Sequence, residues 1–217
     1  MQKREILLKI YHCLFDFFGP LNWWPGDTPF EIMVGAILTQ NTAWGNVEKA
    51  INNLKKANLL EAQKLYQIEE EELAELIRPS GYYKVKAQRL KNLVTFLVEE
   101  YGGSERKMFA EDGEELREKL LAIKGIGPET ADSILLYAGN KPFFVVDAYT
   151  RRIFSRHQLI PEAATYSEIQ DFFTQNLDRE VKLFNEFHAQ IVMLGKTICT
   201  SKKENCTSCP LAFLNSK

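Results

Sequence analysis

The stretch that decides the fold runs from Leu120 to Arg156 and reads LLAIKGIGPETADSILLYAGNKPFFVVDAYTRRIFSR. Apolar residues recur with helical spacing on both sides of Lys124-Gly125-Ile126-Gly127, which predicts two helices joined by a tight hairpin. Two glycines that flank one apolar residue let the hairpin backbone approach another surface closely. Pro128 suits the first position of the second helix, where its missing N–H costs nothing. The free N–H groups of such a turn suit a phosphate.

The second half of the stretch is a short apolar run, Phe143 to Val146, followed by Asp147 and a further helix. Many helical turns contain Gly-x-Gly, and an aspartate before a helix is usually an N-cap, so each half alone is only suggestive. Together they resemble the helix-hairpin-helix, Gly/Pro-rich, Asp signature of the endonuclease III superfamily of DNA glycosylases. The matching residues are Lys124-Gly125-Ile126-Gly127, Thr130-Ala131 and Val145-Val146-Asp147. The resemblance covers nearly the whole chain.

Helical periodicity dominates the rest of the sequence, so the predicted class is all-α. Only Phe143–Val146 looks strand-like, and it is too isolated to build a sheet. The resemblance implies more than the periodicity does: two helical domains with a DNA-binding cleft between them. One would be a continuous six-helix domain at 28–140, which includes the helix-hairpin-helix. The other would be discontinuous, formed by 1–27 and 141–217, and would carry the C-terminal cysteines.

Asp147 matches the catalytic aspartate of the superfamily. Breaking a base–sugar bond passes through a cation-like sugar, so an enzyme needs a fixed negative charge beside it. The nucleotide must also leave the base stack. The role implied for Asp147 is to stabilise the sugar cation and to orient or deprotonate the attacking water. An N-cap role for the same carboxylate is compatible with this function.

Position 129 departs from the pattern of the bifunctional members. They carry a lysine two residues after the second hairpin glycine, and its amine attacks the sugar to form a Schiff base. This chain has Glu129 there, and a carboxylate cannot form an imine. The strand-cleaving lyase step is therefore expected to be absent or very weak. Glu129 is either an ordinary residue of a first helical turn or a helper group near the flipped sugar.

Three tryptophans and a proline are predicted to form the base pocket: Trp23, Trp24, Pro25 and Trp44. Adjacent tryptophans in a Pro/Gly loop suit a flat wall for a base better than a core. An alkylated purine such as 3-methyladenine is cationic, and a cation over an indole face gains roughly 0.5–2 kcal/mol. With Arg78-Pro79-Ser80-Gly81-Tyr82-Tyr83, this combination resembles the 3-methyladenine branch of the superfamily. The alternative is that the tryptophans only pack the two domains together.

The resemblance also assigns residues to DNA binding. Gln40 matches the residue that the superfamily inserts into the gap left by the flipped base, and Asn41 could assist it. The basic segment near the C-terminus resembles one that touches DNA phosphate in relatives. The full predicted DNA-binding set is Gln40, Asn41, Lys124, Gly125, Ile126, Gly127, Thr130, Arg151, Lys202 and Lys203.

Three cysteines near the C-terminus predict a metal centre. Cys199, Cys206 and Cys209 have the spacing of the superfamily's iron–sulfur ligands, but Asn215 stands where the fourth cysteine is expected. A [4Fe–4S] cluster completed by another group, a degraded site and a different metal all remain open. Cys13 lies on an apolar stripe and is better explained as a buried structural cysteine. No cofactor is needed for hydrolysis of the base–sugar bond.

Composition sets looser bounds. The chain has 217 residues and a net charge of −2, which argues mildly against nucleic acid, although basic residues cluster at positions such as Lys84 to Lys91. No apolar run approaches the ~20 residues of a membrane span, and the N-terminus does not resemble a signal peptide. We therefore expect a cytoplasmic monomer without membrane contact.

The sequence as a whole predicts a monofunctional glycosylase of base-excision repair. Its expected partner is double-stranded DNA with damaged bases, and its expected substrate is an alkylated purine. The alternatives are a bifunctional glycosylase/lyase that acts on oxidised pyrimidines and a helix-hairpin-helix module that binds DNA without catalysis.

Overall fold

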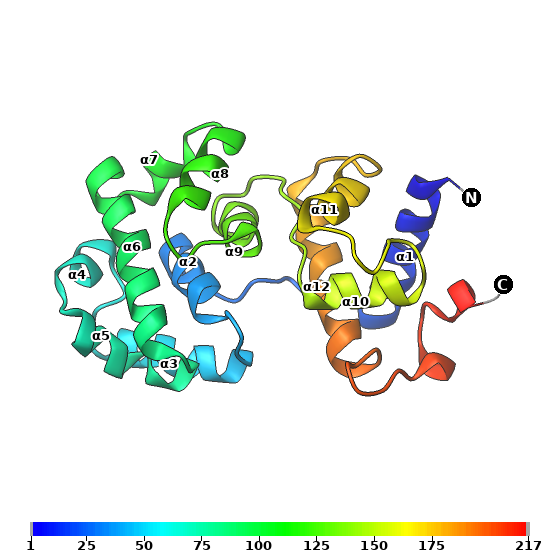
Figure 1. Ribbon diagram of the computed structural model, residues 1–217, viewed down its shortest axis with the longest axis horizontal. Coiled ribbons are helices and arrows are strands. Elements are labelled where there is room, and N and C mark those ends of the chain that lie inside the picture. The colour runs from blue at the N-terminus through cyan, green and yellow to red at the C-terminus, as the bar shows by residue number, and fades with distance from the viewer. Residues whose placement is uncertain (1, 216–217) are drawn as a thin grey trace. The chain divides into compact units, whose positions relative to one another are not determined.

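The computed structural model describes residues 2–215, without the side chain of Asn215, and Figure 1 shows its helices. Within this range there is no β-strand, only one isolated bridge between Cys199 and Glu204, which confirms the all-α class. The α-helices are α1 Lys3–Phe18, α2 Pro29–Leu38, α3 Trp44–Lys56, α4 Ala62–Gln67, α5 Glu70–Leu76, α6 Tyr83–Tyr101, α7 Glu105–Phe109, α8 Gly113–Ala122, α9 Pro128–Ser133, α10 Ala148–Arg156, α11 Tyr166–Thr174 and α12 Val181–Thr197. None of the helices in this range is long and apolar enough to cross a membrane.

The chain divides into two compact units. Unit 1 comprises Met1–Trp24 and Pro142–Lys217, and unit 2 comprises Pro25–Lys141. Unit 1 therefore contains α1 and α10 to α12, whereas unit 2 contains α2 to α9. The sequence-based prediction placed the two domain boundaries between residues 27 and 28 and between residues 140 and 141.

Unit 2 is built around α6. Its apolar stripe, Leu90, Leu93, Val94 and Leu97, is buried, and the helix packs against α2, α4 and α5. Figure 1 shows α6 running along the unit beside these shorter helices. A lysine is also buried there: Lys86 is 1% exposed, and its Nζ donates hydrogen bonds to the carbonyl oxygens of Leu38 and Ser80, at 2.8 and 2.7 Å. Burial, together with the charge of Arg89, lowers the pKa of Lys86 to about 8.

Aromatic rings form the core of unit 1. Phe144 is fully buried and stacks on Phe173, with 3.8 Å between ring centroids and 10° between planes. Phe184 and Phe187 meet Phe144 edge to face at 5.4 and 6.1 Å. Aromatic pairs in these geometries add roughly 0.5–1.5 kcal/mol to the effect of burial. Because Phe144 lies three residues before Asp147, this cluster fixes the segment that presents the carboxylate.

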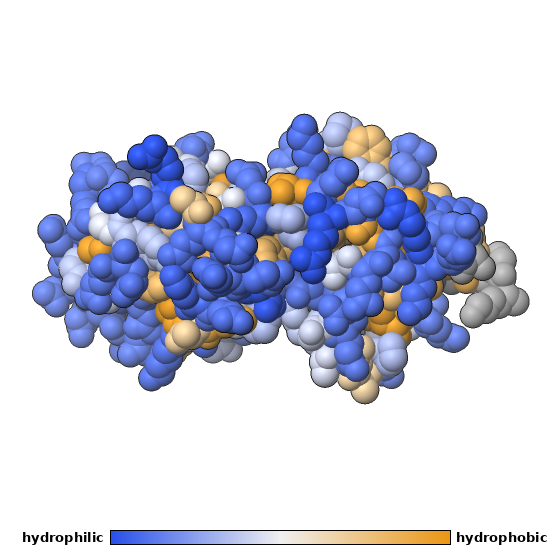
Figure 2. All heavy atoms as spheres, turned by 90° about the horizontal axis from the view of Figure 1, so that it is seen from above, coloured by the Kyte–Doolittle hydropathy of each residue, from blue (hydrophilic) through white to orange (hydrophobic). Residues whose placement is uncertain are grey.

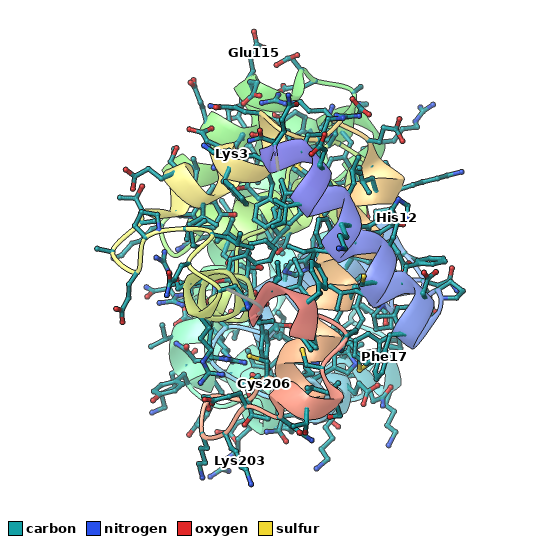
Figure 3. The ribbon with its side chains drawn as sticks, turned by 90° about the vertical axis from the view of Figure 1, so that its right-hand side faces the viewer. Lys3, His12, Phe17, Glu115, Lys203 and Cys206 are labelled. Atoms are coloured by element: carbon teal, nitrogen blue, oxygen red, sulfur yellow. The ribbon has the colours of Figure 1, made fainter. Side chains whose placement is uncertain are left out.

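The surface of the molecule is mostly polar. Figure 2 shows one face on which hydrophilic residues predominate and apolar residues form small scattered patches. Phe17 is among the few large apolar side chains that are exposed, at 53%, and Figure 3 labels it at the end of α1.

Replacing Phe144 with alanine should destabilise unit 1 by about 3–5 kcal/mol, because a fully buried ring leaves a cavity. Denaturant unfolding followed by near-ultraviolet circular dichroism measures the change. Phe17→Ala is the matched control, and it should shift stability by no more than about 0.5 kcal/mol. Equal effects of the two substitutions would contradict the assignment of the core.

Candidate active site and DNA-contacting turns

The predicted hairpin is present between α8 and α9. Its Gly125 has φ +100°, a conformation that favours glycine, and a Cβ there would lie 2.3 Å from Cγ of Arg89. Ile126 is buried and anchors the turn in unit 2, whereas Lys124 and Gly127 are exposed. Pro128 occupies the first position of α9, as expected. The turn thus exposes backbone at the start of a helix, where the first N–H groups lack partners within the helix.

Glu129 lies in the first turn of α9 and is exposed. An acidic side chain is favoured at this end of a helix. Its neighbour Thr130 is buried and points into unit 2, where its Oγ1 accepts a hydrogen bond from Gln40. Thr130 therefore contributes to the packing of the hairpin through its side chain.

Gln40 lies in the loop between α2 and α3, with its side chain bound within unit 2. Its Nε2 donates to Thr130 Oγ1 at 3.0 Å and to the Gly125 carbonyl at 3.3 Å. Its Oε1 accepts a hydrogen bond from Nη1 of Arg89. Asn41, the next residue, is exposed and has φ +53°. Of the two amides, Asn41 is the one presented to solvent.

Asp147 is the N-cap of α10. Its Oδ1 accepts hydrogen bonds from the backbone N–H of Thr150 at 2.7 Å and from the Thr150 hydroxyl at 3.0 Å. Its Oδ2 lies 3.5 Å from Nε2 of His188 on α12. The side chains of Asp147 and His188 are only 12% and 5% exposed. The capping role therefore uses one oxygen of the carboxylate, while the other faces an imidazole.

The carboxyl group of Asp147 is ionised at neutral pH despite its burial. Burial acts to raise its pKa, but hydrogen bonding and charge from His188 and two hydrogen bonds from Thr150 outweigh it, so the pKa lies below the ordinary value. A low pKa suits a group that must carry negative charge and does not suit a general acid. The site can thus stabilise a developing positive charge.

Two of the predicted pocket tryptophans lie in unit 1, whereas Pro25 and Trp44 belong to unit 2. The rings of Trp23 and Trp24 are 5.9 Å apart and meet edge to face at 82°. Nζ of Lys196 lies 5.2 Å from the centroid of the Trp23 ring. Burial lowers the pKa of Lys196, and the negative charge of Asp147 acts in the opposite direction. The Lys196 ammonium group is therefore attracted both to the ring of Trp23 and to the carboxylate of Asp147.

The predicted basic contacts differ in their surroundings. Lys202 and Lys203 are exposed in the C-terminal segment, and Figure 3 shows Lys203 at its outer edge. Arg151 instead donates a hydrogen bond from Nη1 to the carbonyl of Ala164, within unit 1. Lys203 bonds to Thr200 through its backbone only, and no recorded hydrogen bond engages the side-chain amine of either lysine. These amines therefore suit a phosphate better than Arg151 does.

The three C-terminal cysteines line one cavity of about 170 Å³. The other lining residues are Arg156, His157, Ile198, Glu204 and Asn205. Two sulfur atoms accept hydrogen bonds: Cys199 Sγ from Nη1 of Arg156 at 3.1 Å, and Cys209 Sγ from the backbone N–H of Leu211 at 3.4 Å. The Leu211 N–H acts to lower the pKa of Cys209, but burial outweighs it, so the pKa of this thiol is raised. No three His, Cys, Asp or Glu side chains among the described residues are placed to hold a single metal ion.

Two residues of this site carry no signal in the motifs of the sequence. His188, on α12, places its Nε2 3.5 Å from Oδ2 of Asp147. Nothing local in the sequence pairs them, because they lie on different helices. Lys196 was not singled out, although it lies two turns after His188 on α12. Two residues two turns apart lie near the same face of a helix, so the spacing of His188 and Lys196 is the sequence feature that could have linked Lys196 to this site.

Comparison with known proteins identifies the class. Residues 34–179 match the family described as HhH-GPD superfamily base excision DNA repair protein, so the chain belongs to this superfamily of DNA glycosylases. It is 51% identical over 210 residues, covering 96% of this chain and 95% of the relative, to a Methanocaldococcus jannaschii protein provisionally named a DNA repair glycosylase. It is also 29% identical over 181 residues to endonuclease III of Thermotoga maritima, covering 83% of this chain and 79% of that protein.

Solved structures agree in fold. The Helicobacter pylori 3-methyladenine DNA glycosylase, bound to 1,N6-ethenoadenine, matches with a TM-score of 0.78 and 34% identity, over 94% of this chain and all of that chain. An endonuclease III–DNA covalent intermediate matches with a TM-score of 0.83 and 21% identity, over 99% of this chain and 95% of that one. The resemblance inferred from the hairpin and Asp147 is therefore confirmed, and DNA is the partner of this class.

Replacing His188 with glutamine should lower base release at neutral pH by roughly 10- to 100-fold while DNA binding is retained. Without His188 a factor that lowers the pKa of Asp147 is lost, so the pKa should rise. Base release depends on the ionised form, which is lost as pH falls through that pKa, so the acid limb of the rate profile should move to higher pH.

The measurement is single-turnover base release across the acidic range, and His12→Gln on the exposed face of α1 is the control. If the acid limb is unchanged in His188→Gln, His188 contributes to packing and does not lower the pKa of Asp147.

Proposed function

We propose that this chain is a monofunctional DNA glycosylase that removes alkylated purines, with 3-methyladenine as the preferred base, and leaves the abasic strand uncut. The observation that carries the proposal is the buried carboxylate of Asp147, which the contacts with Thr150 and His188 keep ionised. The likeness to the Helicobacter pylori 3-methyladenine glycosylase supports the choice of substrate.

The chemistry follows from the charge at this site. As the base–sugar bond breaks, the sugar gains positive charge, and Asp147 stabilises it. The same carboxylate orients the attacking water or takes its proton. Hydrogen bonds from Thr150 hold Oδ1, so Oδ2 is the oxygen that acts on the sugar side.

An alkylated purine suits a site whose carboxyl group does not act as a general acid. Methylation places a positive charge on the base, which makes it a good leaving group without protonation. Because the pKa of Asp147 is held low, this carboxyl group cannot supply a proton to the base at neutral pH. A neutral oxidised base would need a proton donor in addition, whereas a cationic base does not.

The tryptophans provide the surface for such a base. Trp23 already attracts the ammonium group of Lys196, at 5.2 Å from its ring centroid, and a cationic purine is attracted to an indole face for the same reason. In this proposal Trp23 and Trp24, which lie together in unit 1, hold the flipped base.

One observation favours a second function. Lys196 has a lowered pKa and interacts electrostatically with Asp147, so it is an amine that could attack the sugar. A lyase step through Lys196 would make the enzyme bifunctional although Glu129 replaces the usual lysine.

Replacing Asp147 with asparagine should reduce release of 3-methyladenine from methylated duplex DNA by at least about 10²-fold, because an amide carries no charge for the sugar cation. Binding to the duplex should survive. Chromatography of the free base, with a thymine-glycol duplex assayed in parallel, measures the effect. Asp16→Asn, at an exposed position of α1, is the control.

Full base release by Asp147→Asn would overturn the proposal. Absence of base release from the wild type, with intact binding, would favour the non-catalytic DNA-binding module.

Borohydride should trap no covalent complex between the wild-type protein and damaged DNA, because no imine forms. Denaturing gel electrophoresis detects such a complex as a slower band. If a band appears and Lys196→Gln abolishes it while Lys182→Gln does not, the enzyme is bifunctional and the monofunctional proposal fails. Lys182 is the matched control because it lies on the same helix.

We also propose that the three-cysteine cavity takes up an iron–sulfur cluster. The three sulfur atoms would have to move closer together on binding, because no three His, Cys, Asp or Glu side chains among the described residues are now placed to hold a metal ion. Cys199, Cys206 and Cys209 would hold the cluster, and the hydrogen bonds from Arg156 and Leu211 would stabilise the bound sulfurs. The spacing of these cysteines resembles that of the superfamily's iron–sulfur ligands. Its contribution would be to the folding of the C-terminal segment, since the hydrolysis depends on Asp147.

Anaerobic reconstitution with iron and sulfide should therefore give visible absorption and bound iron. Cys206→Ser should lose both while α-helical circular dichroism is kept. Cys13→Ser, at the other free cysteine, is the control and should retain them. Failure of the wild type to bind iron would indicate a degraded site.

A further inference from the structure

We propose that Glu186 and Gln190, on one face of α12, are positioning residues that hold the segment 19–22 and thereby fix the two tryptophans that follow it relative to the carboxylate of Asp147. This inference rests on the proposed function, since it deepens the account of how the base is held. It concerns unit 1 alone, to which all of these residues belong.

The segment between the end of α1 and the tryptophans has no regular secondary structure. Residues 19–22 lie outside any helix, so their backbone groups need partners from other parts of the chain. Gly19 is the C-cap of α1, with φ +71°, and its N–H donates to the carbonyl of Phe15 at 2.8 Å. The other recorded hydrogen bonds of this segment go to side chains of α12. Its path therefore depends on that helix.

The carboxylate of Glu186 receives the backbone of this segment. Its Oε1 accepts a hydrogen bond from the N–H of Leu21 at 2.8 Å, and its Oε2 accepts one from the N–H of Asn22 at 3.4 Å. Hydrogen bonds to a charged acceptor are stronger than those between neutral groups. The carboxylate therefore holds the two residues that directly precede Trp23.

Gln190, one turn further along α12, completes the attachment. Its side chain is fully buried, and its Nε2 donates to the carbonyl of Gly19 at 2.7 Å and to Oε1 of Glu186 at 2.6 Å. These two bonds use both N–H groups of the amide. Gln190 thus holds the start of the segment and also fixes the carboxylate that holds its end.

The same helix carries the imidazole that faces the proposed catalytic group. His188 lies between Glu186 and Gln190 in the sequence, and its Nε2 is 3.5 Å from Oδ2 of Asp147. Residues four apart share a face of a helix, whereas a residue two positions away points to a different side. One rigid helix therefore holds the tryptophan segment on one side and faces the carboxylate on another.

A further contact fixes α12 against α10, the helix that Asp147 caps. A Cβ at Gly195 would lie 2.3 Å from Cδ1 of Tyr149 on α10, so the glycine lets this ring pack against the backbone of α12. The next residue, Lys196, places its Nζ 5.2 Å from the centroid of the Trp23 ring. The position of Trp23 relative to α10 is therefore set through α12.

The first test separates holding of the base from binding of the DNA backbone. Glu186→Ala and Gln190→Met should slow single-turnover release of 3-methyladenine by about 10- to 100-fold, because the indoles lose their fixed place. Affinity for a duplex with a stable abasic analogue, which offers no base, should stay within about twofold of the wild type, since phosphate contacts position the duplex. Glu186→Gln keeps an acceptor for the N–H of Leu21 and should lose no more than about threefold in rate.

Glu162→Ala and Gln175→Ala, at exposed positions of unit 1, are the matched controls. Unchanged base release in Glu186→Ala and Gln190→Met would overturn the proposal. A loss of affinity for the abasic duplex as large as the loss in rate would also overturn it, because the defect would not be confined to the base. A wild type that releases no base would count against the proposed function, and the second test would then decide on the positioning role.

The second test needs no catalysis. The chain has three tryptophans, so Trp44→Phe leaves Trp23 and Trp24 as the ones that acrylamide quenching reports on. Adding Glu186→Ala or Gln190→Met to this parent should raise the quenching constant by about twofold or more, because the released segment opens locally. Amide hydrogen exchange should rise at residues 19–24, while α1 and α12 keep their protection.

If quenching and exchange stay as in the Trp44→Phe parent, the segment does not depend on α12 and the proposal fails. Far-ultraviolet circular dichroism checks that each variant folds, and Glu186→Leu replaces Glu186→Ala if the latter does not.

Discussion

The structure depends on keeping one carboxylate charged inside a nearly closed environment. Removing an ionised group from water is costly unless hydrogen bonds and an opposite charge compensate. Asp147 receives two hydrogen bonds from Thr150 in its own helix, and the imidazole of His188 on α12 lies 3.5 Å from its other oxygen. The aromatic cluster around Phe144 then fixes the chain just before the carboxylate. The arrangement of α10, α12 and the preceding segment follows from this requirement.

Local chemistry in the sequence was enough to predict part of this arrangement. The tight hairpin at Lys124–Gly127 and the placement of Pro128 follow from properties of single residues, and the structure shows both. Long amphipathic helices such as α1 and α6 were also predictable, because their apolar periodicity extends over several turns. Two helices, α4 and α7, are too short for this signal, since six and five residues cannot show a period.

Partners that come from distant parts of the chain were beyond local reasoning. The pairing of His188 with Asp147 depends on how α12 packs against α10. The inward orientation of Gln40 depends on Arg89 and on the hairpin, neither of which is near it in sequence. In both cases the residue type is visible in the sequence, but the contacts of its side chain become known only from the tertiary structure. The cavity lined by the cysteines and Arg156 is a further case, because Arg156 comes from α10.

The buried amine of Lys86 can report, through its reaction with a chemical label, when the core of unit 2 opens. Its amine is 1% exposed and engages two carbonyl oxygens, so an acylating reagent reaches it only when the core around α6 opens. Lysines on the surface react at once, whereas the labelling rate at position 86 follows the opening of this unit alone. Peptide mass spectrometry thus measures how fast the core of unit 2 around α6 opens, without a spectroscopic label.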